Sequence, residues 1–385
     1  MVSADPPRSR PRVIIVAHSL DAADGGMETV HVELLERQLD RVDVVAVTMR
    51  LDPRLHGRVR FEPIKVPSRP APVRFVLFYL LASIRVWRLR RPGDVVHTCG
   101  AIIANRVGVA TVHTVSAAIV AARGGRLTSR GAPLARRVNS GALRALALIA
   151  ERWTYRPGRV DALCAVSSTT ARELSESYPG VSIVITPNGV DTERFAPDPA
   201  VRASMRRDLG LGDHIVALFV GGDFERKGLA VAIEALCAAP SVTLVVAGSG
   251  DLDRARGVAR AFGVNDRVHL LGQRSDVERL AQMADIYVCA SLYEADSLAL
   301  LEGAAAGLAL VSTPVGSAPT VIGEPPQSSG LLVDRSPAAL GAALEELAND
   351  PDARERCGAQ ARLVALGRSW DTVADQVLEL YRTIS

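Results

Sequence analysis

Short runs of β-branched and aliphatic residues recur along this chain, separated by segments long enough to form helices. In the first half the runs cover residues 12–17, 42–47, 94–97, 108–113, 162–166 and 182–186. In the second half they cover residues 214–220, 242–247, 268–271, 286–289, 308–312 and 330–333. Strands separated in this way form parallel sheets with helices on both faces. The sequence therefore predicts an α/β chain with two Rossmann-like, doubly wound domains facing a central cleft.

Two prolines interrupt this pattern in the segment 195–200, between the two halves. We therefore place an N-terminal domain at residues 1–197 and a C-terminal domain at residues 198–369. The final segment, about 370–385, can form an amphipathic helix whose apolar face consists of Val373, Val377, Leu378, Leu380 and Tyr381. We expect this helix to be able to pack back on the N-terminal domain.

The bulk composition excludes several classes of protein. A length of 385 residues fits two domains better than one, and a net charge of +3 is too small to indicate nucleic acid as a partner. The five cysteines are scattered without paired spacing, which predicts reduced core residues in a cytoplasmic protein. No stretch resembles a signal peptide or reaches the roughly 18 apolar residues of a membrane span.

Two basic segments of the first half leave a membrane contact open. Residues 73–91 are apolar but are broken by Arg74 and Arg85 and end in a basic cluster. Residues 121–137 form an arginine-rich segment. Both could meet the inner face of an anionic membrane, as a peripheral contact. A buried helix with a basic end and a plain solvated loop explain them equally well.

Two glutamates, Glu294 and Glu302, follow the apolar run 286–290. We expect Glu294 in the turn after a strand, and Glu302 more than one turn into a helix over 298–306 that Gly307 closes. Ligands of open α/β sheets bind outside the carboxyl ends of the strands. Carboxylates there can accept hydrogen bonds from sugar and ribose hydroxyls, while helix N-terminal amides face a diphosphate. Taken alone, the same spacing also suits a solvated helix face.

Adjacent cations mark the start of the second half. Arg226 and Lys227 stand between the glycines of Gly221-Gly222 and Gly228, where a strand ends and a helix begins. The glycines leave backbone room and the two cations suit a diphosphate, although a basic surface turn has the same composition.

Further glycines end two other strands. Gly248 and Gly250 follow the run 242–247 and suit either a ligand or an ordinary turn. Gly25 and Gly26 precede a helix expected to begin near Thr29, and they can admit a phosphate or a sugar. No third glycine stands at the dinucleotide spacing, so NAD binding is not predicted.

Among the seven histidines, His113 is the best placed, because it ends the run 108–113. His97, at the end of the preceding run, is second. A histidine at a strand end is a structural hydrogen-bonding group about as often as a functional one. No His, Cys, Asp or Glu pattern has metal-ligand spacing, and neither a Gly-x-Ser-x-Gly elbow nor a Gly-Lys-Ser/Thr phosphate loop is present.

The order of these motifs resembles that of the retaining glycosyltransferases of family 4, which have the GT-B fold. The resemblance runs from about Arg12 to the segment that starts at Trp370, and its most specific parts are Pro187-Asn-Gly-Val-Asp191 and the glutamate pair. The other motifs are Gly25-Gly26-Met-Glu, His113, Ala165-Val-Ser-Ser168, Arg226-Lys-Gly228 and Gly248-Ser-Gly250. The stretch 221–228 is closest in style to the bacterial lipopolysaccharide-core glucosyltransferases.

The resemblance implies a hexosyltransferase that moves a sugar from a UDP- or GDP-sugar to a hydroxyl group of a glycan, a glycolipid or a specialised metabolite. It implies no metal and no other cofactor, and an N-terminal domain that selects the acceptor. Arg226 and Lys227 would hold the diphosphate and stabilise the leaving group. Glu294 would contact the sugar, Glu302 the ribose, and His113 would lie beneath the sugar. Further donor-binding positions would be Gly25, Gly26, Asn188, Gly222, Gly248, Gly250, Asp296, Ser297 and Leu298. Attack from the front face, assisted by the donor phosphate, would replace a glutamate nucleophile.

One segment departs from the family pattern. Most members have Gly or Ser, then Phe and Gly, after the first glutamate, whereas this chain has Ala295-Asp-Ser-Leu298. Asp296 could repel the diphosphate or cap the helix. It is the one feature that favours an inactive nucleotide-sugar-binding protein. A hydrolysing sugar-nucleotide epimerase of the same fold is the other alternative, and the Pro-Asn-Gly-Val-Asp segment argues against it. The donor base, the sugar and the acceptor stay open.

Overall fold

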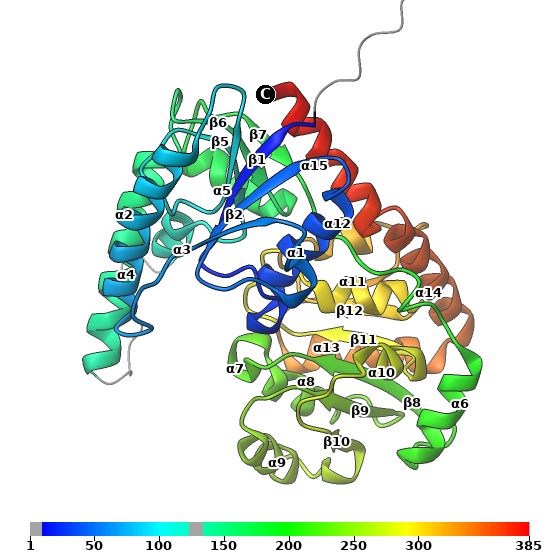
Figure 1. The fold of residues 1–385 in the computed structure, drawn as a ribbon. Coiled ribbons are helices and arrows are strands. Elements are labelled where there is room, and N and C mark those ends of the chain that lie inside the picture. Colours follow the sequence, from blue (N-terminus) through cyan, green and yellow to red (C-terminus); the bar gives the residue numbers. More distant parts are fainter. Residues whose placement is uncertain (1–9, 123–133, 385) are drawn as a thin grey trace, which may run out of the picture. The chain divides into compact units, whose positions relative to one another are not determined.

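The computed structural model describes residues 10–122 and 134–384 (Figure 1). The chain divides into two compact units. Unit 1 combines the chain up to Pro187 with the segment from Val373 onward, and unit 2 runs from Asn188 to Thr372. The chain therefore passes from one unit to the other twice, at 187/188 and at 372/373.

Of the two prolines expected to mark the domain boundary, Pro199 begins a helix, α6 (Pro199–Asp208), and Pro197 precedes its cap. Asp198 is its N-cap, and the Asp198 carboxylate accepts hydrogen bonds from the amides of Ala200 and Val201. A proline in the first turn of a helix loses no hydrogen bond, because that amide has no partner within the helix. Pro199 is therefore a helix start inside unit 2, and Pro197 lies in the same unit.

Unit 1 is built on a seven-stranded parallel sheet in the order β3-β2-β1-β4-β5-β6-β7. Its strands are β1 (Arg12–Val16), β2 (Asp43–Thr48), β3 (Arg60–Pro63), β4 (Val95–Cys99), β5 (Val107–Val112), β6 (Val160–Ala165) and β7 (Ile183–Ile185). Its helices are α1 (Gly26–Gln38), α2 (Ala71–Leu89), α3 (Ser116–Ala122), α4 (Leu134–Thr154), α5 (Ser168–Ser177) and most of α15 (Trp370–Ile384), with short 3-10 turns η1 (Ala22–Asp24) and η2 (Pro53–Leu55).

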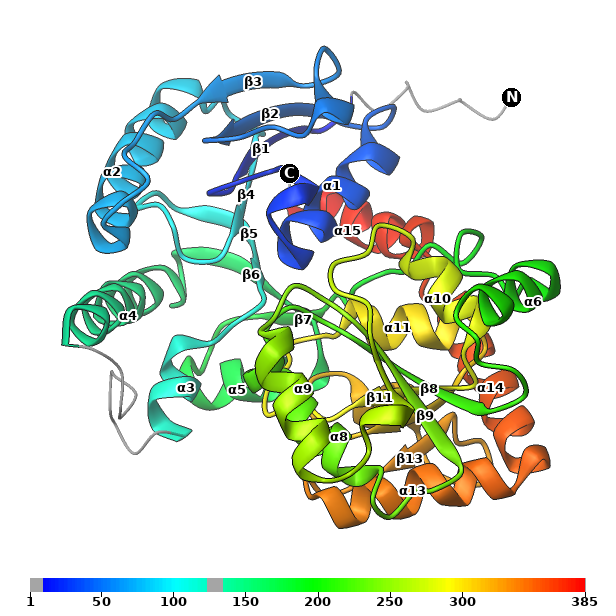
Figure 2. The same ribbon diagram turned by 90° about the horizontal axis from the view of Figure 1, so that it is seen from below.

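Helices cover both faces of this sheet (Figure 2). On one face, Phe78 and Val86 of α2 and Leu174 of α5 share a buried apolar core with Ile14 and Val16 of β1. On the other face lie α1 and α15, and the Gln38 side-chain amide donates to the Ala374 carbonyl at 2.9 Å. The C-terminal helix thus belongs largely to unit 1.

Unit 2 is built on a six-stranded parallel sheet in the order β10-β9-β8-β11-β12-β13. Its strands are β8 (Ile215–Val220), β9 (Val242–Ala247), β10 (Val268–Leu270), β11 (Ile286–Cys289), β12 (Ala309–Ser312) and β13 (Gly330–Leu332). Besides α6, its helices are α7 (Phe224–Lys227), α8 (Leu229–Ala235), α9 (Leu252–Ala261), α10 (Val277–Met283), α11 (Leu298–Ala305), α12 (Ala318–Ile322), α13 (Pro337–Asn349) and α14 (Pro351–Leu366), with a 3-10 turn η3 (Asn265–Arg267).

Side chains of this sheet alternate between two cores, as the pleat of a strand requires. Along β8, Val216 and Leu218 belong to a core shared with α6, α10, α11 and α14. Ala217 and Phe219 belong to a second core shared with α8, α9 and α13. Both sheets are therefore covered on both faces, which confirms the two Rossmann-like, doubly wound domains predicted from the sequence.

The order in which the strands are added reverses once in each sheet. This change of direction falls between β1 and β4 in unit 1 and between β8 and β11 in unit 2. In open α/β sheets ligands bind beside such changes of direction.

Every run predicted as a strand is a strand. The strand β3 was not predicted, because Arg60-Phe-Glu-Pro63 is short, charged and ends in proline. The cysteines are free, and Cys237 is exposed, so the expectation that all are core residues is wrong for Cys237.

Candidate functional site

The turn after β8 brings two cations to the change of direction in unit 2. The Lys227 side chain passes so close to Gly221 that a Cβ atom on Gly221 would lie 2.5 Å from Lys227 Cδ. At Gly228, which has a φ of +76°, a Cβ atom would lie 2.1 Å from the Ala290 carbonyl oxygen. Only glycine lets α7 approach the end of β11 so closely. These glycines therefore position Arg226 and Lys227.

Both cations bind Glu294, which follows β11. Arg226 Nη1 lies 3.2 Å and Lys227 Nζ 3.0 Å from Glu294 Oε1. The Ser291 hydroxyl donates to the same oxygen at 2.8 Å. Arg226 Nη1 also donates to the Tyr293 carbonyl at 2.8 Å. The structure thus brings three predicted site residues together in one ion-pair cluster on neighbouring strand ends.

Glu302 lies on α11, within electrostatic range of the same cluster. Burial raises the pKa of Glu302 to about 7, while the charges of Arg194 and Lys227 oppose the shift and Glu278 adds to it. Arg194 pairs with Glu278 at 2.7 Å. The sequence reasoning did not single out Arg194 or Glu278, although Arg194 stands three residues after the Pro187-Asn-Gly-Val-Asp191 motif.

Asp296 does not cap α11, contrary to one of the two expectations for it. Ser297 is the cap, and its hydroxyl accepts from the Leu300 amide at 3.4 Å. One Asp296 carboxylate oxygen accepts from the Asn188 amide at 2.7 Å, and the other accepts from the Ser317 hydroxyl. Both oxygens therefore have partners within the protein, and in this structure they are not directed at a free anion site.

The glycines after β9 are explained by protein packing. A Cβ atom on Gly248 would lie 1.9 Å from the Gly221 carbonyl oxygen, and one on Gly250 would lie 2.3 Å from the Phe224 ring. One on Gly222 would lie 2.9 Å from Ser249 Oγ. A cavity of about 410 Å³ adjoins these turns, between α7, α8 and α9. Arg226, Lys227, Glu294 and Glu302 do not line it, so it is separate from the charged cluster.

In unit 1, Gly25 and Gly26 lie at the start of α1, which begins at Gly26, three residues before the predicted start near Thr29. The Gly25 carbonyl accepts from both the amide (3.0 Å) and the hydroxyl (2.9 Å) of Thr29. No side chain caps the N-terminus of α1. The Glu28 carboxylate of the first turn bonds its own backbone amide and lies close to Gly25, so one carboxylate already stands at the start of this helix.

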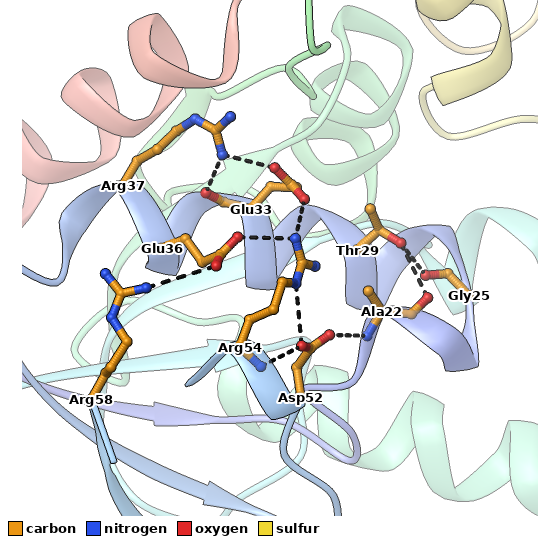
Figure 3. A network of polar contacts seen from close by, with 9 residues as sticks. All are labelled: Ala22, Gly25, Thr29, Glu33, Glu36, Arg37, Asp52, Arg54 and Arg58. Atoms are coloured by element: carbon orange, nitrogen blue, oxygen red, sulfur yellow. Dashed lines mark hydrogen bonds and ion pairs between the residues drawn. The ribbon is translucent and has the colours of Figure 1, made fainter. Parts of the chain in front are cut away.

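A polar network anchors the loop before α1 (Figure 3). Asp52 accepts from the Ala22 amide at 3.1 Å and from the Arg54 amide at 2.9 Å. Burial would raise the pKa of Asp52, but these hydrogen bonds and the Arg54 guanidinium lower it below its ordinary value. Arg54 also pairs at 2.9 Å with Glu33 and Glu36 of α1. The glycine loop is thus fixed to both η2 and α1.

Three imidazole rings meet at the same edge of the unit 1 sheet. His113 follows β5, His97 lies in β4, and His31 comes from α1. The His31 ring packs edge-on against His113, with centroids 5.4 Å apart, and against His97 at 6.1 Å. Burial lowers the pKa of His113 and of His97 to about 4, and that of His31 well below its ordinary value. All three rings are therefore neutral at pH 7.

The three histidines differ in their hydrogen bonds. His97 Nδ1 contacts the Tyr381 hydroxyl at 2.5 Å and Nε2 contacts the Thr111 hydroxyl at 2.8 Å. Both nitrogens of this ring therefore have hydrogen-bond partners within the protein. Nε2 of His113 and Nε2 of His31 are buried without a hydrogen-bond partner. The sequence reasoning missed His31, because it stands on the apolar face of α1. Within residues 10–122 and 134–384, no three His, Cys, Asp or Glu side chains are grouped to hold a metal ion.

Fold and site define an α/β protein of two doubly wound units, with a cation–carboxylate cluster at one sheet edge and neutral histidines at the other. Two family models match the chain: Glycosyltransferase Family 4 over residues 24–194, and Glycosyl transferases group 1 over residues 201–364. The chain belongs to this family of glycosyltransferases.

Similar proteins come from Mycobacterium tuberculosis and Corynebacterium glutamicum. The GDP-mannose-dependent alpha-(1-6)-phosphatidylinositol monomannoside mannosyltransferase of Mycobacterium tuberculosis is 31% identical, over 58% of this chain and 62% of that protein. The D-inositol 3-phosphate glycosyltransferase of Corynebacterium glutamicum is 33% identical, over 51% of this chain and 50% of that protein. The chain thus spans less than two thirds of the length of these relatives.

Among solved structures, WaaG, a glycosyltransferase involved in lipopolysaccharide biosynthesis, superposes with a TM-score of 0.77. That match covers 95% of this chain and 98% of WaaG at 20% sequence identity. Anabaena HepE in complex with UDP and glucose gives a TM-score of 0.73 at 17% identity, over 97% of this chain and 99% of that chain. At these identities the comparison establishes the GT-B fold.

Proposed function

We propose that this protein transfers a glycosyl group from a nucleoside diphosphate sugar to a hydroxyl acceptor, with retention of configuration and without a divalent metal. The observation that carries the proposal is the cluster of Arg226, Lys227 and Glu294 at the change of direction in unit 2. Such a donor offers what this cluster and Glu302 can bind: a diphosphate for the cations, and ribose and sugar hydroxyls for the carboxylates. The family membership supports the same class of reaction.

Donor binding would exchange the partners of the two cations. In the free protein Arg226 and Lys227 are bound by Glu294; the diphosphate oxygens would take that place and leave Glu294 to accept from a sugar hydroxyl. As the glycosidic bond to the phosphate breaks, negative charge grows on the leaving diphosphate, and the two cations stabilise it. A Glu294 carboxylate that accepts from a sugar hydroxyl would orient the sugar rather than attack its anomeric carbon. Phosphate-assisted front-face attack therefore fits the site better than a glutamate nucleophile.

Backbone amides would complete the donor site. Leu298 begins α11, and the first amides of this helix, apart from that of Leu300, which donates to Ser297, would suit the distal phosphate. In unit 1 the uncapped start of α1 at Gly25 and Gly26 offers similar donors. The unpartnered Nε2 of His113 would bond a sugar hydroxyl as a neutral imidazole. The remaining proposed donor-binding positions are Asn188, Gly222, Gly248, Gly250 and Ser297, whereas both Asp296 oxygens have partners within the protein.

Calorimetric titration of the protein with GDP, UDP and their sugar conjugates, in magnesium and in EDTA, tests the donor site. GDP-sugars come first, because one relative is named as GDP-mannose-dependent. We expect binding of one nucleotide that is unchanged by EDTA. The anomeric coupling in the NMR spectrum of the product then tests retention. Loss of binding in EDTA would rule out a metal-independent mechanism, and a product of inverted anomeric configuration would rule out retention.

The same assay separates the two alternatives. Binding of the intact donor without transfer across glycan, glycolipid and small-alcohol acceptors would identify an inactive nucleotide-sugar-binding protein. Release of a free epimerised sugar would identify an epimerase. Release of nucleoside diphosphate that depends on an added acceptor supports glycosyl transfer against both.

We also propose that α2 and α4 of unit 1 contact an anionic membrane surface. On α2, the face opposite the buried residues Phe78, Ala82 and Val86 is also apolar. It exposes Val73, Val76, Leu80, Leu81, Ile84 and Trp87, the last at 73%. The neighbouring α4 exposes Val138, Ile149 and Trp153.

The charges around this apolar face favour anionic lipid. No acidic residue occurs in α2, whereas Arg74, Arg85 and Arg88 lie on it and Arg90 and Arg91 follow it. Basic residues beside an apolar stripe bind anionic bilayer surfaces through both burial and charge. No helix in the described part of the chain has the length and apolar character to cross a bilayer. Most of the basic segment 121–137 lies outside the described residues.

Sedimentation with vesicles of phosphatidylglycerol or of phosphatidylcholine tests this surface. We expect binding to the anionic vesicles that Leu80→Glu with Ile84→Glu reduces at least tenfold. The matched control is Leu363→Glu with Leu366→Glu, two exposed leucines of α14 in unit 2. Equal losses in both variants, or no binding by the wild type, would rule out this contact surface.

A further inference from the structure

A reciprocal contact joins Asp296 to the first residue of unit 2. The Asn188 amide donates to the Asp296 carboxylate at 2.7 Å, and the Asn188 side-chain amide donates to the Asp296 carbonyl at 3.0 Å. Asn188 is 3% exposed and Asp296 is 8% exposed. The point at which the chain enters unit 2 is therefore fixed to the loop between β11 and α11.

The segment after Asn188 is held in place from its other side. A Cβ atom on Gly189 would lie 2.5 Å from the Trp370 ring, and the Val190 amide donates to the Arg368 carbonyl at 2.9 Å. Trp370 and Arg368 stand just before the point where the chain leaves unit 2 at 372/373. Both passages of the chain are thus adjacent within unit 2, and Asp296 contacts the first of them.

The opposite side of the 294–296 loop is held by the turn before α12. The Ser317 hydroxyl donates to the second Asp296 oxygen. Gly316, with a φ of +55°, approaches so closely that its Cβ atom would lie 2.9 Å from the Glu294 carbonyl oxygen. Asp296 stands two residues after Glu294 and one before Ser297, the N-cap of the helix that carries Glu302. Any shift of the carboxylates on donor binding acts directly on this loop.

We propose that Asp296 is a positioning residue that couples the donor-binding loop, which carries Glu294, to the chain passage at Asn188. The coupling rests on the proposed function, because it assigns a use to the donor site described there. The Asp296 side chain bridges the two segments, because one carboxylate oxygen accepts from Asn188 and the other from Ser317.

The groups around Asp296 make its protonation state sensitive to changes in nearby charge. Burial raises the pKa of Asp296 to about 6, and the charge of Glu294 adds to this shift. The hydrogen bonds from Ser317 and Asn188 and the charge of Arg368 oppose it. When the donor takes the two cations from Glu294, the charge balance two residues from Asp296 changes. Donor binding therefore changes the electrostatic environment of the carboxylate that holds Asn188.

Hydrogen exchange of residues 183–190, with and without the nucleoside diphosphate that binds, tests the coupling. In the wild type we expect nucleotide to slow exchange in this segment at least threefold. Asp296→Ala should abolish that response while nucleotide affinity stays within about threefold, because Arg226 and Lys227 are intact. Asp296→Asn should keep it, since its amide oxygen can accept from Asn188 and its NH2 can donate to Ser317. In turnover assays, Asp296→Ala should lower kcat at least tenfold with little change in KM.

The matched control is Asp285→Ala, another buried carboxylate of unit 2, which accepts from Arg202, Arg206 and the Val216 amide. It should lower the melting temperature without removing the nucleotide response. A response that survives Asp296→Ala, or one that is lost equally in both variants, overturns the proposal and reduces Asp296 to a structural residue. Nucleotide binding without any response in the wild type also overturns it, but leaves the proposed function standing. No binding of any nucleotide would overturn both.

Discussion

The carboxyl edges of the two sheets have the same topology, but one carries charged side chains and the other carries neutral ones. In unit 2 the edge carries Arg226 and Lys227, both paired with Glu294, and Glu302 nearby. In unit 1 it carries His31, His97 and His113, whose pKa values are lowered by burial so that no ring is charged at pH 7. The same change of direction in a sheet therefore provides a place for a site, and the side chains decide its chemistry.

The binding groups of the two edges also differ in the partners that they have before a ligand binds. A charge that lacks a partner is costly to bury, so the buried Glu294 carboxylate is paired with the two cations, and a diphosphate can take its place on them. A neutral imidazole can be buried without a counter-ion and can still donate or accept a hydrogen bond. Unit 2 is thus suited to an anion, and unit 1 to hydroxyl groups. The predictions below test this division, beginning with the largest effect.

Removal of Lys227 should have the largest effect. The chain has only two lysines, Lys65 and Lys227, against many arginines. The Lys227 stem fits against Gly221, where a Cβ atom would lie 2.5 Å from it. We expect Lys227→Ala to lower kcat/KM by about 100-fold or more, with a matching loss of nucleoside diphosphate affinity. Titration calorimetry and initial rates measure both.

Lys227→Arg sharpens this prediction, because it keeps the charge and changes only the shape. The branched, planar guanidinium does not fit the path of the lysine stem, so we expect most of the loss to remain. The exposed Lys65 provides the control, and Lys65→Ala should behave as the wild type. Full activity of Lys227→Arg would show that charge alone is required at this position.

The sequence predicted more of the fold than of the contacts within the site. The apolar runs predicted both sheets, because buried parallel strands need continuous aliphatic residues. The strand β3 lacks this signal, since it lies at the edge of its sheet with two charged residues and a proline. The predicted boundary at 197/198 rested on Pro197 and Pro199, of which Pro199 begins α6. The chain instead enters unit 2 at Asn188, inside the Pro187-Asn-Gly-Val-Asp191 motif interpreted from the sequence as part of the site.

In the site, spacing indicated which residues stand at strand ends but not what they contact. Arg226, Lys227 and Glu294 could be placed near one another because neighbouring parallel strands end at the same edge. The partners of Asp296 lie 108 positions earlier and 21 positions later in the chain, so no local pattern reveals them. His31 looks like any residue on a buried helix face until the fold brings it against His113.

His113 provides the second prediction, because its effect should separate turnover from donor binding. We expect His113→Ala to lower kcat by about 10- to 100-fold, as for the loss of one buried hydrogen bond worth about 1.5–3 kcal/mol. Nucleoside diphosphate affinity should stay within about threefold, since the cations and Glu302 belong to unit 2. An equal loss of nucleotide affinity would contradict the division of tasks between the two edges.

Glu302 should make donor binding dependent on pH. Its pKa of about 7 in the free protein means that it is largely protonated below pH 7. Ribose hydroxyls donate best to the carboxylate, so nucleotide affinity should rise with pH through this range, with proton release on binding. The slope approaches tenfold per pH unit below the pKa. Glu302→Gln should bind more weakly and with a flat profile. Calorimetry from pH 5.5 to 8 in two buffers of different ionisation enthalpy measures both quantities.

The stability of the protein should follow the same group with a defined sign. Because the folded-state pKa lies above the ordinary value of 4.5, the protonated form favours folding. This contribution, roughly 1–3 kcal/mol, is fully present below pH 4.5 and is lost as the pH rises through 7. Glu302→Gln should therefore be more stable than the wild type at pH 8 and similar at pH 4.5. A pH-independent difference in urea denaturation would exclude the raised pKa.

The smallest effect is expected at His31, and it has the opposite sign from that at His97. The buried Nε2 of His31 has no partner, so His31→Phe removes an unsatisfied polar atom and should raise stability by about 1 kcal/mol. His97→Phe would leave the Tyr381 and Thr111 hydroxyls without partners and should lower stability by about 1–3 kcal/mol. Urea unfolding midpoints compare the two variants directly. If His31→Phe proved as destabilising as His97→Phe, then Nε2 of His31 must bond an ordered water, and the neutral edge of unit 1 would be a hydrated polar site.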